Sequence, residues 1–123
     1  MLRFYHCNHS VTDIDRSRAF YEKEFGLKVM REVNAYSGDL RLMFLGDGIT
    51  DFRLELTWYR SHPQPFELGD KEFHVAFYTD DFDATLAKHR GDGIVVKEEL
   101  EHRLYYIEDP DGYQVEIVEM PSE

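Results

Sequence analysis

Cysteine is nearly absent from the sequence, since Cys7 is the single one among 123 residues. One cysteine cannot form an intramolecular disulfide, which is typical of proteins from a reducing compartment. A run of about 18 apolar residues, long enough to cross a bilayer, is also missing. The opening segment MLRFYHCNHS lacks the apolar stretch of a signal peptide. We therefore expect a cytoplasmic protein with no membrane partner, in which Cys7 is a small apolar strand residue.

Basic residues are few, because 14 Lys and Arg stand against 25 Asp and Glu and give a net charge of −11. No cluster of basic residues interrupts this balance. Nucleic acids and anionic membranes are therefore not expected as partners, since both require a basic surface. Glycine-rich phosphate loops and paired CxxC zinc motifs are missing as well. The acidity predicts a well-solvated surface, with a cationic or metal-held substrate as the alternative.

What the chain does contain is enough apolar sequence for one folded domain over residues 1–123, since 42% of its residues are hydrophobic and 15% aromatic. A first helix is expected to begin after Asp13 or Asp15 and to end at Gly26, and a second to span 82–89. Two prolines and a glycine predict a linker at 61–71. Strands are expected at residues 1–8, 28–33, 40–45 and 51–59, and again at 72–78, 94–98, 103–107 and 113–119.

The two halves of the chain repeat each other. His6 and His74 are each followed seven residues later by an Asp-x-Asp motif. RLMFL in the first half corresponds to RLYYI in the second, and LEL around Glu55 corresponds to VEI around Glu116. Four matches in the same order predict two tandem βαβββ modules of an α+β fold, at residues 1–60 and 72–120.

The repeat singles out four side chains as candidate metal ligands: His6, Glu55, His74 and Glu116. Two imidazoles and two carboxylates suit a divalent transition metal, and a dication offsets the cost of burying the carboxylates. They converge if the first and last strands of each module are neighbours. Taken singly, each His is better explained as a core or half-exposed residue and each Glu as the solvent face of a strand. Recurrence at equivalent positions favours the metal set.

Other polar residues of the sequence have simpler explanations. The Asp-x-Asp motifs precede the helices, which predicts capping rather than metal binding. The remaining histidines have no counterpart in the repeat and are expected on the surface or in loops: His9, His62, His89 and His102.

At these residues the sequence resembles glyoxalase I (lactoylglutathione lyase) of the vicinal-oxygen-chelate superfamily. The segments RSRAFYEKEFGLKV, LELTW, FHVAF and EDPDGYQVEIVE carry the resemblance, together with the four candidate ligands. It implies a curved, partly open barrel of mixed sheets with the helices outside. It also implies a homodimer in which each metal site takes one His and one Glu from each of the two subunits. For a short chain such as this one, the metal implied is Ni²⁺ or Co²⁺, with Zn²⁺ as the alternative.

The activity that the resemblance implies is isomerisation of the hemithioacetal of methylglyoxal and a thiol to an S-lactoyl thioester. The resemblance also implies that a bound metal would stabilise the negative charge that develops on the two substrate oxygens of an enediolate. By the same analogy Glu116 is the chief acid/base residue, and Glu55 is a ligand and possible second base.

The thiol itself is left open by departures from the family pattern. Ser10 and Tyr59 stand where many glutathione-using members carry an arginine and an asparagine, and the acidic KEELEH at 97–102 replaces a Lys-Gly loop. A different thiol is one alternative. Others are an epimerase, an antibiotic thiol transferase, a ring-cleaving dioxygenase, or a non-catalytic resistance protein that binds a small molecule.

Overall fold

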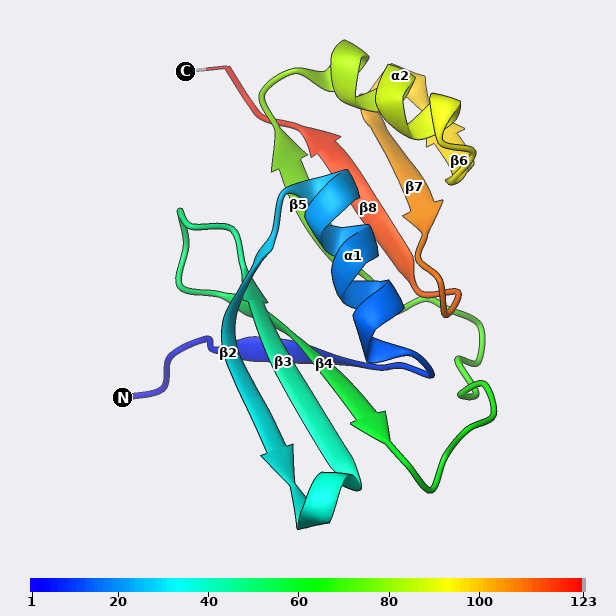
Figure 1. The fold of residues 1–123 in the computed structure, drawn as a ribbon. Coiled ribbons are helices and arrows are strands. Elements are labelled where there is room, and N and C mark those ends of the chain that lie inside the picture. Colours follow the sequence, from blue (N-terminus) through cyan, green and yellow to red (C-terminus); the bar gives the residue numbers. More distant parts are fainter. Residues whose placement is uncertain (123) are drawn as a thin grey trace. The chain divides into compact units, whose positions relative to one another are not determined.

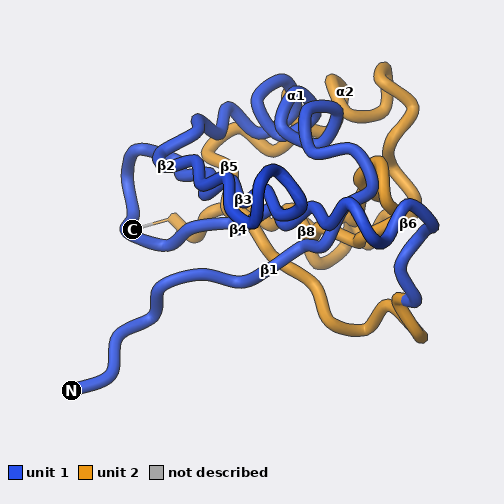
Figure 2. The backbone as a smooth tube through the Cα atoms, turned by 60° about the horizontal axis from the view of Figure 1, so that its bottom comes forward, with its two compact units in different colours: residues 1–67 blue, residues 68–123 orange. Residues whose placement is uncertain are grey.

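The protein is described by a computed structural model that covers residues 1–122, and it divides into two compact units. Unit 1 begins at Met1 and ends at Glu67, and unit 2 begins at Leu68 (Figure 2). Each unit holds one helix and one four-stranded mixed sheet in the chain order βαβββ (Figure 1). This order confirms the two-module α+β fold expected from the repeat.

The sheet of unit 1 has the strand order β1-β4-β3-β2. The first and last strands of the unit, β1 and β4, are parallel neighbours, and the other pairs are antiparallel. A short 3₁₀ turn at Tyr36–Gly38 joins β2 to β3. The elements of unit 1 are β1 (His6–Ser10), α1 (Ile14–Phe25), β2 (Lys28–Ala35), β3 (Leu40–Gly46) and β4 (Arg53–Tyr59).

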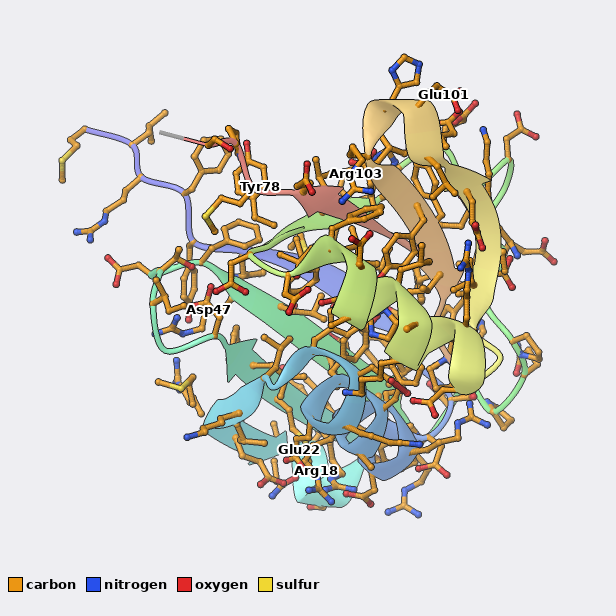
Figure 3. All side chains as sticks on the ribbon, turned by 90° about the horizontal axis from the view of Figure 1, so that it is seen from above. Arg18, Glu22, Asp47, Tyr78, Glu101 and Arg103 are labelled. Atoms are coloured by element: carbon orange, nitrogen blue, oxygen red, sulfur yellow. The ribbon has the colours of Figure 1, made fainter. Side chains whose placement is uncertain are left out.

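Helix α1 has the ends expected from the sequence. The side chain of Asp13 accepts a hydrogen bond from the backbone nitrogen of Arg16, and Gly26 closes the helix with a φ of 67°, which glycine adopts without strain. The helix packs on β2, β3 and β4. Its exposed side carries the Arg18–Glu22 ion pair, whose two side chains lie next to each other in Figure 3.

Unit 2 repeats the topology with the strand order β5-β8-β7-β6, in which β5 and β8 are parallel. The N-cap of its helix is Asp81, and the rings of Phe82 and His89 contact Tyr105 on the sheet. A 3₁₀ turn at Leu100–His102 joins β6 to β7. The elements of unit 2 are β5 (Val75–Thr79), α2 (Phe82–Gly91), β6 (Val95–Glu99), β7 (Leu104–Glu108) and β8 (Gln114–Glu119).

The two faces of each sheet differ in burial. On β8, Val115 and Ile117 are buried and Glu116 between them is only half-buried. On β4, Leu54 and Leu56 flank a glutamate in the same way. Because side chains alternate along a strand, the apolar residues belong to the core and the glutamates belong to the opposite face.

Three expectations from the sequence need correction. The first strand begins at His6 rather than Met1, because Met1–Tyr5 makes no continuous ladder and its Leu2 and Phe4 are almost fully exposed. His9 and His89 are buried rather than superficial. In the core, His9 Nδ1 lies 3.2 Å from the Tyr21 hydroxyl and His89 Nδ1 lies 2.7 Å from the Tyr105 hydroxyl. A tyrosine hydroxyl offsets the cost of burying each polar ring.

None of the helices within residues 1–122 combines the length and the apolar character needed to cross a membrane.

Candidate metal centre

Each candidate His–Glu pair is positioned by two neighbouring parallel strands, although His74 itself lies one residue before its strand. On β1 and β4, Glu55 is opposite the residue that comes two positions after His6. On β5 and β8, Glu116 is opposite the residue that comes two positions after His74, which immediately precedes β5. Residues two positions apart share a face of the sheet. The same register therefore brings one imidazole beside one carboxylate in both units.

The two pairs have the same separation. His6 Nε2 lies 3.6 Å from Glu55 Oε1, and His74 Nε2 lies 3.6 Å from Glu116 Oε1. The carboxylate side chains are 15% and 16% exposed, and the imidazoles are 31% and 32% exposed. Each unit thus holds a half-site in which a mostly buried carboxylate and a more accessible imidazole are reached from one face.

An aromatic ring flanks the imidazole of each half-site. Phe44 on β3 is opposite Glu55, and its ring meets that of His6 edge to face with 5.5 Å between centroids. Tyr106 on β7 is opposite Glu116, and its ring meets that of His74 edge to face at 5.3 Å. A cation lies over each ring: Arg31 over Phe44 and Lys97 over Tyr106.

Both members of the unit 2 pair are held by a further hydrogen bond. His74 Nδ1 lies 2.9 Å from the carbonyl oxygen of Glu72. Because a carbonyl only accepts, Nδ1 donates this hydrogen bond, which leaves Nε2 as the ring nitrogen that could bind a metal. The hydroxyl of Tyr106 donates to Oε2 of Glu116 at 3.1 Å. Burial, followed by this hydrogen bond, raises the pKa of Tyr106, so the hydroxyl keeps its proton at neutral pH.

The unit 1 pair lacks this support within the described part of the chain. No hydrogen bond reaches Nδ1 of His6 or Oε2 of Glu55, and Phe44 has no hydroxyl to offer. Thr57 Oγ1 lies 3.4 Å from Glu55 Oε1 but only 2.5 Å from Asn8 Oδ1. A hydroxyl has one proton to donate, and the shorter contact takes it. Among residues 1–122, Glu55 is therefore paired with His6 through Oε1 but has no hydrogen bond on Oε2 like the one that Tyr106 gives Glu116.

The donor atoms of each half-site fit a divalent transition metal. Two ligands with bonds of about 2.1 Å at right angles lie about 3 Å apart, close to the separation in each pair. Residues 1–122 contain no single group of three or more His, Cys, Asp or Glu side chains arranged for a metal. One half-site supplies two ligands, so a four-ligand centre requires two half-sites.

Cys7 does not add a ligand to the unit 1 pair. It follows His6 on β1, so its side chain points to the other face of the sheet. Burial raises the pKa of its thiol, which disfavours the thiolate that binds metals.

Tyr106 is the site residue that the sequence interpretation missed. The signal was present, because alignment of RLMFL with RLYYI places Phe44 against Tyr106. What the alignment could not show is that the added hydroxyl reaches a carboxylate on the neighbouring strand. That contact depends on the register of β7 with β8, in which Tyr106 is opposite Glu116.

Comparison with known proteins identifies the family of the chain. Residues 3–117 match the family described as Glyoxalase/Bleomycin resistance protein/Dioxygenase superfamily. The lactoylglutathione lyase of Haemophilus influenzae is 32% identical over 129 residues, which cover 98% of this chain and 95% of the relative. The lactoylglutathione lyase of Escherichia coli O157:H7 is 31% identical over 126 residues, covering 96% and 93%.

Among solved structures, the trypanothione-dependent glyoxalase I of Leishmania major superposes with a TM-score of 0.85 at 27% identity. The superposition covers 97% of this chain and 87% of that one. The similarity therefore extends over the fold as a whole and is not confined to one unit.

Proposed function

The chain belongs to the Glyoxalase/Bleomycin resistance protein/Dioxygenase superfamily, and from this membership we propose that it is a metal-dependent glyoxalase I. Its substrate would be the hemithioacetal of methylglyoxal and a thiol, and its product the S-lactoyl thioester. Lactoylglutathione lyases matched over nearly the whole chain support this activity. The observation that carries the proposal is the His–Glu pair that recurs with the same register and the same 3.6 Å separation in both units.

Four side chains would hold the metal: His6, Glu55, His74 and Glu116. We propose that the protein acts as a homodimer. Each metal would be held by the His6–Glu55 pair of one subunit and the His74–Glu116 pair of the other. A divalent metal so held would supply positive charge where negative charge develops on the two substrate oxygens. Ni²⁺ and Co²⁺ are the metals proposed first, with Zn²⁺ as the alternative.

The protein's own residues would move the proton. Glu116 is the proposed acid/base residue, which takes the proton from the carbon that bears sulfur and returns it to the adjacent carbon. Its Oε1 lies beside His74 Nε2, on the same face of the sheet. Glu55 is the proposed second base. A mostly buried carboxylate suits this role, because exclusion of water strengthens its interaction with the reacting atoms.

The thiol and the place of action are further parts of the proposal. We propose that the thiol need not be glutathione. Lys97 is the one Lys or Arg at the positions where the sequence departs from the glutathione-using pattern, which are Ser10, Tyr59 and the acidic segment 97–102. Lys97 is itself paired with Glu99. We place the activity in the cytoplasm, since the single cysteine is typical of a reducing compartment.

Metal analysis of the purified protein tests the proposal, followed by assays with methylglyoxal and several thiols, glutathione and trypanothione among them. We expect a bound transition metal and formation of a lactoyl thioester with at least one thiol. Absence of a bound metal, together with no thioester after addition of Ni²⁺, Co²⁺ or Zn²⁺, would contradict it.

A further inference from the structure

We propose that Tyr106 is a positioning residue of the metal centre, whose hydroxyl holds Oε2 of Glu116 so that Oε1 alone is presented beside His74. The inference rests on the proposed metal site and assigns a role in it to a residue that is neither a ligand nor a base. The two carboxylate oxygens already have different neighbours, because Oε2 accepts from the hydroxyl at 3.1 Å and Oε1 lies 3.6 Å from the imidazole.

The position of Tyr106 is suited to this role. Its ring lies opposite Glu116 on β7 and contacts the edge of the His74 ring, so one side chain touches both members of the half-site. The ring packs against the imidazole while the hydroxyl reaches the carboxylate. A side chain that fixes both partners lowers the ordering cost of metal binding.

The other unit supplies an internal comparison. Phe44 has the same register against Glu55 and a similar edge contact with His6, but it has no hydroxyl. In unit 1 the rings of Phe44 and Tyr5 pack beside His6. Within residues 1–122 no tyrosine hydroxyl reaches Glu55, whereas that of Tyr106 reaches Glu116. A phenylalanine at position 106 would reproduce what unit 1 already accommodates.

The hydroxyl of Tyr106 has no comparable task in the core. Tyr105, the preceding residue on β7, faces the opposite side of the sheet, where it is fully buried and bonds to His89 at 2.7 Å. Tyr106 is half-buried, and Glu116 is its hydrogen-bond partner. Of these two adjacent tyrosines on β7, Tyr105 thus supports the core and Tyr106 contacts the half-site.

The test compares the wild-type protein with Tyr106→Phe, and uses Tyr105→Phe as the matched control that removes one hydroxyl from the other face of the strand. Four quantities are measured on the protein: Co²⁺ affinity by competition with a chelator, the visible absorption spectrum of the Co²⁺ form, and kcat and KM with methylglyoxal and the best thiol. The melting temperature of each metal-free protein is recorded beside them.

For Tyr106→Phe we expect Co²⁺ affinity to fall about tenfold, with a changed Co²⁺ spectrum, a lower kcat and an unchanged KM. The melting temperature should stay that of wild type. For Tyr105→Phe we expect the reverse, a lower melting temperature with unchanged Co²⁺ affinity and spectrum. Wild-type Co²⁺ affinity and spectrum in Tyr106→Phe would overturn the inference, as would a loss confined to the melting temperature.

The outcomes distinguish this inference from the proposed function. A wild-type protein that binds Co²⁺ but forms no thioester with any thiol contradicts the glyoxalase activity, while the comparison of Co²⁺ affinities still decides the role of Tyr106. If the wild-type protein forms thioester and Tyr106→Phe has the same Co²⁺ affinity, Co²⁺ spectrum and kcat, the inference alone is contradicted. A wild-type protein that binds none of Co²⁺, Ni²⁺ and Zn²⁺ overturns both.

Discussion

The half-sites of the two units share their backbone plan and differ in how their side chains are fastened. In both, parallel neighbouring strands bring Nε2 of a His within 3.6 Å of Oε1 of a Glu, with His74 one residue before its strand. In unit 2, the imidazole is tied to the Glu72 carbonyl and the carboxylate to the Tyr106 hydroxyl. In unit 1, residues 1–122 provide neither of these hydrogen bonds. Strand register thus decides that a pair forms, and its neighbours decide how rigid it is.

The cores of the two units each contain a buried His–Tyr pair between the helix and the sheet, but the element that provides the His differs. In unit 1 the strand β1 provides His9 and the helix α1 provides Tyr21. In unit 2 the helix α2 provides His89 and the strand β7 provides Tyr105. A His–Tyr pair between helix and sheet therefore recurs without any matching positions in the sequence, whereas the half-sites recur position by position.

The largest expected difference between the half-sites concerns their carboxylates. Glu116→Gln is expected to lower kcat about 10³-fold, because it removes the proposed acid/base residue. Glu55→Gln is expected to lower kcat less, by about ten- to 100-fold, as loss of a ligand. Both are measured as kcat on protein of verified metal content. Equal losses in the two variants would leave no ground for placing the proton transfer chiefly on Glu116.

The imidazoles should also differ, in metal affinity. His74→Ala is expected to weaken Co²⁺ binding about 100-fold and His6→Ala about tenfold. The Glu72 carbonyl holds the His74 ring with Nε2 beside Glu116, whereas His6 has ring contacts but no such hydrogen bond among residues 1–122. We therefore expect His74 to contribute more. Competition with a chelator measures both affinities. A greater loss in His6→Ala would show that the hydrogen bond to Glu72 does not preorganise the site.

Much of the fold could be predicted from the sequence because its signals are local or repeated. The cap residues Asp13 and Gly26 mark the ends of α1, and the alternation around Glu116 places it apart from the core. The pairing of β1 with β4 followed from requiring His6 and Glu55 to meet. The assignment of these residues to a metal remains a prediction, as does the division of one domain into modules 1–60 and 72–120 with a linker at 61–71.

What could not be predicted depends on partners that are distant in the chain. His9 and His89 look like surface residues until the hydroxyls of Tyr21 and Tyr105 are placed beside them. The contact of Tyr106 could not be predicted for the same reason, since its hydrogen bond to Glu116 arises only from the register of two strands. Polar residues with a single partner give no periodic pattern, and composition alone does not reveal them.

The smallest expected effects test whether the units are alike away from their half-sites. Asp13 accepts from Arg16 N at 3.0 Å, and Asp81 accepts from Ala84 N at 3.2 Å, each at the start of its helix. Asp13→Ala and Asp81→Ala are each expected to lower the free energy of unfolding by about 1 kcal/mol, because one helix donor loses its acceptor. Urea unfolding measures both, and Co²⁺ affinity should not change in either variant. A weaker Co²⁺ affinity in one of them would show that its helix, and not only the neighbours of the His–Glu pair, determines the geometry of that half-site.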